Sequence, residues 1–381
     1  MSTANCIGKR YDEMDIMRGV AILMVLLYHS ILVYPINLVE TNSACGFLHA
    51  FLFSVEMPVF FFVSGFCLVY KGKYLPYLGK KSLRILIPHI IFGVLDIIVR
   101  IAGASFVSSS SGLGDSIIDF LLYGGSDWYL LSLFIMMLIA PAIYKLVRLN
   151  KLAKIMVIAC VILLYLFQNK IPGYFSVRNV VVYLPFFLAG ILFRLRKDSS
   201  DNSVSLLKRF AMFFVFLITG IGLFIVMRWE GWNGQPEAWN LLFGADSSIH
   251  AIRETLACEI WPGLDILRIK LIYLTGTILG QFLLVSALYQ IVIITAARFK
   301  NWFLRECSRY SLQMYLFDGY LLVLTRVLIV SIAGVTNAWV IIAFNFVIDT
   351  AGVFLISKYI LGKWRVLRIM TGIPDRGDNI K

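Results

Sequence analysis

The sequence predicts an all-α protein that crosses a membrane about ten times and keeps both termini in the cytoplasm. Its composition, its long apolar runs and the distribution of its basic residues support this fold class. Hydrophobic residues make up 60% of the 381 positions, charged residues make up 15%, and the mean hydropathy is +0.83. A soluble domain carries about 25% charged residues. A water-soluble globular protein is therefore excluded.

The apolar residues gather in runs of roughly 18 to 25 residues, long enough to cross a hydrocarbon core about 30 Å thick. The eighth run is long enough to be tilted or kinked. The expected spans are 14–34, 47–70, 83–102, 128–147, 152–169, 177–194, 208–228, 270–297, 310–332 and 337–360. The first run is a full span with no small-residue cleavage site after it, which favours a retained helix over a secretory signal peptide.

The basic residues indicate the orientation of these spans. With the N-terminus in the cytoplasm, the connecting segments on that side hold 26 of the 35 Lys and Arg residues, and the outer loops hold 6. Cytoplasmic loops of membrane proteins carry such an excess. The net charge of +13 is then a signal of topology, and we expect no nucleic-acid partner. The prediction is a multi-pass protein of the plasma or inner membrane.

One membrane domain over residues 1–365 and a short basic cytoplasmic tail over 366–381 account for the chain. Two outer loops, 103–127 and 229–269, are longer than the other connections. Four of the eight tryptophans lie in the second loop: Trp229, Trp232, Trp239 and Trp261. They fit either an aromatic belt at the bilayer interface or a platform on which sugar rings stack. Cys45 and Cys258 fall in outer loops, where they either pair or stay as thiols.

The first span carries two ionisable residues on one helix face. In DIMRGVAILMVLLYHS, residues 15–30, Arg18 and His29 are eleven residues apart, which is three turns plus about 20°, or about 16 Å along the axis. Asp15 precedes Arg18 by one turn and is able to pair with it. An arginine at a span end commonly reaches the headgroups, whereas a histidine deep in a membrane usually faces a cavity or pathway. A role for His29 in helix packing alone is the alternative.

The second and third spans add further ionisable residues. Glu56 lies well inside the second span and shares a face with His49. A buried carboxylate takes up a proton or finds a partner, and His29 on an adjacent helix is the expected partner. Lys81 and Arg84 lie one turn apart at the cytoplasmic mouth of the third span, as a phosphate-bearing ligand from the cytosol requires. Most such basic clusters only follow the positive-inside rule.

The last two spans also hold buried charge. Asp318 and Arg326 lie in the ninth span and Asp349 lies in the tenth. For Arg326 and Asp349 we favour structural ion pairs between helices. The chain has no phosphate-binding loop, serine-nucleophile elbow, paired-cysteine motif or metal-spaced histidine cluster. We therefore expect no metal.

These segments resemble the integral-membrane acyltransferase 3 family, in particular its branch related to fucose O-acetylases. DIMRGVAILMVLLYH is similar to the family's opening pattern of Asp, Arg, Gly, an apolar run and His. EMPVFFFVSGF is similar to its second-span segment, and KKSLRILIPH stands where the family has a basic pair spaced by two residues. DWYLLSLF, YLPFFLAGILF and SLQMYL resemble later segments, so the similarity covers most of the chain. Three residues depart from the pattern: Glu56 and Asp318 each replace a usual histidine, and Lys81 replaces an arginine.

The resemblance implies transfer of an acyl group, usually acetyl from cytosolic acetyl-CoA, to a cell-surface or lipid-linked carbohydrate across the membrane. It implies that His29 is the central catalytic residue, that Arg18 is its partner in the motif, and that Lys81 and Arg84 contact the CoA phosphates. A carboxylate, Glu56 or Asp15, would set the tautomer of His29, and Glu56 is better placed by depth. The residues expected to contact the acceptor are Trp128, Trp232, Trp239 and Asp318.

Two other functions use the same residues. A proton-coupled transporter would relay protons through the buried histidine and carboxylates, although the paired repeats with interrupted helices of many transporters are not apparent. In a non-catalytic membrane partner or sensor, the charged residues would be structural. Consumption of acyl-CoA separates the enzyme from both alternatives, and substrate flux without acyl transfer identifies the transporter.

Overall fold

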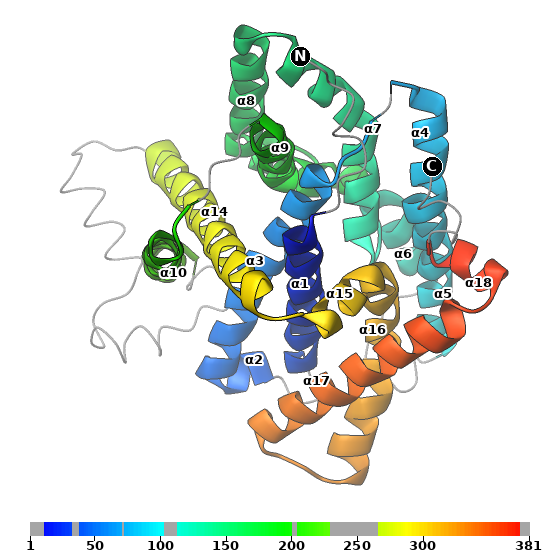
Figure 1. Ribbon diagram of the computed structural model, residues 1–381. Coiled ribbons are helices and arrows are strands. Elements are labelled where there is room, and N and C mark those ends of the chain that lie inside the picture. The colour runs from blue at the N-terminus through cyan, green and yellow to red at the C-terminus, as the bar shows by residue number, and fades with distance from the viewer. Residues whose placement is uncertain are drawn as a thin grey trace.

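The computed structural model describes residues 11–32, 38–70, 72–102, 113–199, 204–228 and 266–373. Within these residues every regular element is helical, and nine helices are long and apolar enough to cross a membrane. The protein is therefore an all-α polytopic membrane protein, as the sequence predicts (Figure 1).

The described helices follow one another along the chain in this order. The N-terminal half contains α1 (Asp12–Ile31), α2 (Leu38–Thr41), α3 (Ser43–Phe66), α4 (Tyr74–Lys81), the π-helical turn η1 (Ser82–Leu86), α5 (Ile87–Ala102), α6 (Leu113–Ile118), η2 (Asp119–Tyr123), α7 (Trp128–Leu149), α8 (Lys151–Leu166), η3 (Gln168–Lys170) and η4 (Tyr174–Ser176). The C-terminal half contains α9 (Val177–Ser199), α10 (Leu206–Arg228), α14 (Ile266–Arg298), α15 (Trp302–Arg309), α16 (Ser311–Arg326), η5 (Val327–Ile332), α17 (Ala338–Leu355), η6 (Ile356–Leu361) and α18 (Arg365–Met370).

Two expected segments differ from the structure. The span expected over 152–169 is α8, which has 16 residues and is not among the nine candidate spans. At 1.5 Å per residue it is about 24 Å long, which is short for a hydrocarbon core of about 30 Å. Asn150 alone connects it to α7, and its side chain accepts the N–H of Ala153 at 2.7 Å. The outer loop expected over 103–127 contains α6 and η2.

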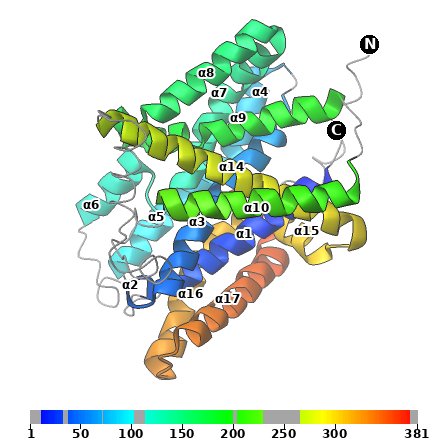
Figure 2. The same ribbon diagram turned by 90° about the vertical axis from the view of Figure 1, so that its left-hand side faces the viewer.

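Helix α1 lies at the centre of the bundle. It contacts α3, α14, α15, α16 and α17, which surround it in Figures 1 and 2. Met17, Ile22 and Leu26 on α1 are fully buried. Helix α10 is the opposite case, because it packs mainly against α14 at the edge of the bundle and leaves Leu207 and Ile218 exposed. The surroundings of α1 therefore hold its polar residues in fixed positions.

One end of the bundle joins segments that the sequence places in the cytoplasm. Ion pairs between described residues connect them: Glu13 with Lys197, Asp12 with Arg305, and Glu306 with Lys358. These pairs tie the start of α1 to the end of α9 and to α15, and they tie α15 to η6. Every partner belongs to a segment with the same expected side. The tertiary contacts therefore agree with the topology that the basic residues indicate.

Helices α3 and α9 cross at two glycines. A Cβ atom on Gly65 would lie 2.0 Å from the backbone oxygen of Phe187, and one on Gly190 would lie 2.1 Å from that of Phe62. Small residues allow membrane helices to approach this closely, and packing of this kind drives their association. Because α3 also carries Glu56, the crossing fixes the position of this carboxylate.

We expect Gly65→Ala and Gly190→Ala each to lower the thermal unfolding midpoint of the purified protein in detergent. Alanine gains about 1 kcal/mol of helix propensity over glycine, but overpacking a close contact costs about 1–3 kcal/mol. The cost lies at the upper end here because the obstructing atoms are backbone. Gly222→Ala on α10 is the matched control, since its Cβ would meet no atom within 4 Å. A midpoint for Gly65→Ala and Gly190→Ala as high as that of the control would contradict the close crossing.

Candidate functional site

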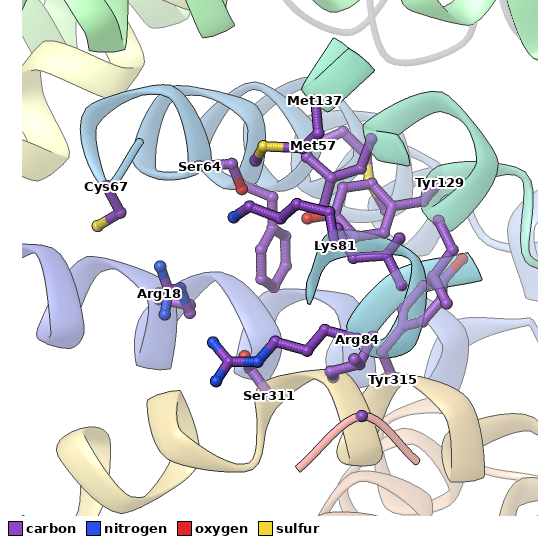
Figure 3. A pocket seen from close by; sticks show the side chains of 16 residues that line it. Arg18, Met57, Ser64, Cys67, Lys81, Arg84, Tyr129, Met137, Ser311 and Tyr315 are labelled. Carbon is purple, nitrogen blue, oxygen red and sulfur yellow. The ribbon is translucent and has the colours of Figure 1, made fainter. Parts of the chain in front are cut away.

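A pocket of about 220 Å³ lies between α1, α3, the α4–η1 segment, α7 and α16. Among the described residues, three cations line it: Arg18, Lys81 and Arg84. The charged ends of Lys81 and Arg84 point to the same side of the pocket as Arg18 (Figure 3). Three positive charges around one pocket suit an anionic ligand, because charge-assisted hydrogen bonds to phosphate or carboxylate are strong.

The glycine that follows Arg18 explains how this arginine is placed. A Cβ atom on Gly19 would lie 2.1 Å from the backbone oxygen of Leu304, so α15 crosses α1 in direct contact at this residue. Asp12 binds Arg305 at 3.2 Å and holds the same crossing. Successive residues of a helix point about 100° apart. When Gly19 faces α15, Arg18 is therefore free to face the pocket.

Lys81 and Arg84 bracket a change in helical geometry. Helix α4 ends at Lys81, and Arg84 lies in the π-helical turn η1. Such turns are frequent at functional sites. The Lys81 Nζ lies 5.6 Å from the centre of the Tyr77 ring, and the Tyr77 hydroxyl donates to the Met137 carbonyl of α7 at 3.2 Å. This contact keeps Lys81 at the pocket wall.

The rest of the pocket lining is largely apolar and leads toward carboxylates. The apolar residues are Met57, Phe60, Ile85, Leu130, Leu133, Met137 and Leu312. The rings of Tyr129 and Tyr315 also line the pocket, with centroids 5.5 Å apart and planes at 64°. Tyr129 lines the pocket together with Arg18, and Tyr315 lies three residues before Asp318 on α16, which places both on one helix face. The two tyrosines therefore connect the cationic end of the pocket to the buried carboxylates.

His29 lies near the opposite end of α1 and binds a carboxylate of α16. Its Nδ1 atom forms a hydrogen bond with Oδ2 of Asp318. The Asp318 side chain is fully buried, whereas the His29 side chain is 33% exposed. A carboxylate on Nδ1 fixes the ring orientation and the tautomer, so that Nε2 carries the basic lone pair.

Asp318 takes the place that the sequence analysis assigns to Glu56. Both carboxylate oxygens of Glu56 are buried and have no hydrogen-bond partner in the described part of the chain, although Glu56 interacts electrostatically with His29 and Asp318. The Asp318 side chain has no exposed surface, and the contact with the acceptor that the sequence predicts for it stays a prediction. Asp15 is 14 residues before His29 on α1, or about 21 Å along the axis, too far to set its tautomer.

The ring of Tyr28 lies beside His29. The Tyr28 ring stacks on His49 with centroids 4.2 Å apart, and its centroid lies 5.1 Å from that of His29. Trp128, at the start of α7, stacks on Tyr183 at 5.8 Å. Tyr28 interacts electrostatically with Tyr183 and Glu56. Tyr28 therefore places an aromatic ring next to His29, and Trp128 and Tyr183 form a second stacked pair.

Four tyrosines of the site were not expected from the sequence: Tyr28, Tyr129, Tyr183 and Tyr315. In the sequence, Tyr28 is next to His29 and Tyr129 is next to Trp128. This adjacency indicates that the residues are close, but it does not indicate that they lie on the same face of a helix.

Other expected residues cannot be placed in the site. Trp232, Trp239 and Cys258 lie outside the described residues, as does the side chain of Arg326, so the roles expected for them stay predictions. Cys45 and Asp349 are buried.

A family model described as an acyltransferase domain matches residues 11–358. The chain belongs to the acyltransferase 3 family. The match includes the His29–Asp318 pair and the cations of the pocket, and it ends before α18. The protein is thus a membrane acyltransferase. No curated protein and no solved structure matches the chain.

The electropositive pocket predicts the reactivity of Cys67, which also lines it. With the other cysteines replaced by alanine, we expect the Cys67 thiol to react faster with an anionic than with a cationic methanethiosulfonate reagent. The ratio of rates, measured by mass spectrometry, is expected to be about tenfold at low salt. Lys81→Met combined with Arg84→Met should lower the ratio toward one, with Arg18 as the remaining cation of the described lining. Arg148→Met removes an exposed cation that bonds Tyr144 instead and should leave it unchanged. A ratio that stays the same when the pocket cations are replaced would contradict this electrostatic description.

Proposed function

We propose that the protein is an O-acyltransferase that moves an acetyl or other short acyl group from cytosolic acyl-CoA to a cell-surface or lipid-linked carbohydrate. The observation that carries the proposal is that α1 joins a cation-lined pocket at Arg18 to a carboxylate-bound histidine at His29. Family membership supports acyl transfer. Resemblance to the fucose O-acetylase branch supports a carbohydrate acceptor and a plasma or inner membrane location.

The pocket suits the anionic part of the donor. Arg18, Lys81 and Arg84 supply charge-assisted donors for the CoA phosphates. The apolar lining suits the uncharged arm of CoA, which must extend about 16 Å along α1 to bring the thioester to His29. Tyr129 and Tyr315 lie on this path. No metal is needed for this arrangement.

The His29–Asp318 pair supplies the acid–base chemistry. Nε2 of His29 takes the proton from an acceptor hydroxyl, whose oxygen attacks the thioester carbonyl while Asp318 stabilises the imidazolium. The carbon–sulfur bond breaks, and the proton passes from His29 to the leaving thiolate. In a second route Nε2 attacks the thioester carbonyl, the carbon–sulfur bond breaks and the CoA thiolate leaves. The hydroxyl oxygen then attacks the acyl carbon on Nε2, the carbon–nitrogen bond breaks, and the hydroxyl proton passes to the thiolate. Acyl-His29 detected by mass spectrometry in the absence of acceptor would identify the second route.

The acceptor side of the site is formed by aromatic residues. Trp128 stacks on Tyr183, and Tyr28 lies beside His29. These rings offer stacking faces for a sugar, with Trp232 and Trp239 as further candidates. The same buried His29, Asp318 and Glu56 would also serve a proton-coupled transporter, which remains the second candidate.

We expect His29→Ala to lower kcat for CoA release by about 10²- to 10⁴-fold, the usual contribution of a general base. The assay uses protein in liposomes with acetyl-CoA and a mixture of cell-envelope glycans. Asp318→Asn should lower kcat with little change in the donor KM, because Asp318 acts through His29. Asp349→Asn removes a buried carboxylate of α17 and is the control, with kcat unchanged. Near-wild-type release by His29→Ala would refute the catalytic assignment, and glycan flux without CoA release would support the transporter.

The cationic pocket predicts a different kinetic effect. We expect Lys81→Ala and Arg84→Ala each to raise the KM for acetyl-CoA by about 10- to 100-fold, because a hydrogen bond to a charged group contributes about 1.5–3 kcal/mol. The kcat should change little, since the lost interaction is common to the ground and transition states. Lys80→Ala is the matched control, because Lys80 is exposed and does not line this pocket. An equal KM for all three variants would exclude this pocket as the donor site.

A further inference from the structure

The segment formed by residues 365–373, called here the C-terminal segment, lies beyond the 11–358 family match but forms part of the pocket wall. Helix α18 packs against α5 (Figure 1). Gly372 lines the pocket together with Arg84. Residues 366–373 belong to the short basic cytoplasmic tail that the sequence predicts over 366–381. The structure instead docks them onto the membrane domain at the cationic end of the pocket.

A buried hydrogen bond anchors the C-terminal segment to α16. The Gln313 side chain donates through Nε2 to the backbone carbonyl of Thr371 at 2.6 Å, and both residues are 2% exposed. The Thr371 hydroxyl donates to the Leu367 carbonyl at 2.7 Å and so holds the end of α18. A buried polar contact is costly when one partner is missing. This anchor therefore specifies one docked position.

Gly372 rests directly on the turn that carries Arg84. Its φ of +72° lies in the left-handed region that favours glycine, and a Cβ atom here would lie 2.4 Å from the backbone oxygen of Arg84. The contacted turn is η1, whose π-helical geometry departs from the regular helix on either side. The C-terminal segment thus supports the one turn of the α4–η1–α5 helix where a small displacement would move Arg84 relative to Arg18 and Lys81.

We propose that the C-terminal segment completes the donor site by positioning Arg84, with Gln313 and Gly372 as the positioning residues. The inference rests on the proposed function for the identity of the ligand, acyl-CoA. Its structural part concerns the place of Arg84 in the pocket and is testable without that ligand. When the contact is lost, η1 and the C-terminal segment leave these positions. The Arg84 side chain then no longer places its charge in the pocket beside the charges of Arg18 and Lys81.

The kinetic test uses Gly372→Ala in the full-length protein in liposomes. The KM for acetyl-CoA is expected to rise roughly tenfold, since small misplacements of a binding group have large effects, while kcat and the acceptor KM stay within about twofold. Gly334→Ala is the matched control, because Gly334 also has a positive φ, +63°, but its Cβ would meet no atom within 4 Å. A merely structural effect would reduce the amount of folded protein and leave the KM unchanged. Gln313→Leu instead removes the hydrogen bond that anchors the C-terminal segment to α16. This variant provides the test if Gly372→Ala does not fold.

The second test measures the electrostatic environment of the pocket in the absence of acyl-CoA. It compares the rates at which anionic and cationic reagents label the Cys67 thiol in protein whose other cysteines are replaced. Gly372→Ala and Gln313→Leu are expected to reduce the anionic-to-cationic labelling ratio by the same fold as Arg84→Met, and Gly334→Ala should leave it unchanged. If the ratio falls but wild-type protein does not release CoA, the positioning role stands and the proposed function fails. If Gly372→Ala and Gln313→Leu match Gly334→Ala in the ratio, the C-terminal segment does not position Arg84 and the proposal is overturned.

Discussion

The contact between His29 of α1 and Asp318 of α16 is the interaction on which the site depends. A buried carboxylate is tolerated in an apolar interior when it is paired, and removal of one partner of such a pair costs about 3–5 kcal/mol. The pair therefore holds α16 against the central helix. Because α16 also brings Ser311 and Tyr315 to the pocket, the same contact that orients the histidine places one wall of the cationic site.

The pocket lining and the surroundings of His29 differ in charge. The described charged residues that line the pocket are the cations Arg18, Lys81 and Arg84, whereas Asp318 and Glu56 lie at the His29 end of α1. Asp15 lies one turn before Arg18 but is not part of the described lining. The uncharged pair of Tyr129 and Tyr315 lies between the two ends. Anion binding and proton transfer are thus assigned to different parts of one helix bundle.

Glycine contacts provide much of the close packing that this arrangement needs. Gly19 meets the backbone of α15, and Gly65 and Gly190 make the crossing of α3 and α9. Lipid is as apolar as leucine, so membrane helices gain little from burying apolar side chains and rely on close backbone packing instead. The Arg18–Gly19 sequence shows the result, because a residue without a side chain at the crossing leaves its neighbour directed into the pocket.

The sequence by itself determined the features that depend on local periodicity and composition. These are the apolar spans, the gathering of basic residues in alternate connections, and the placement of Lys81 and Arg84 one turn apart, whose common pocket the structure shows. Only the tertiary structure decided that Asp318 rather than Glu56 binds His29, and that the C-terminal segment reaches the pocket. Helical periodicity gives the face on which a residue lies, but not the helix that packs against that face. In this protein the choice between α3 and α16 as the partner of His29 was made by close packing between residues far apart in the chain.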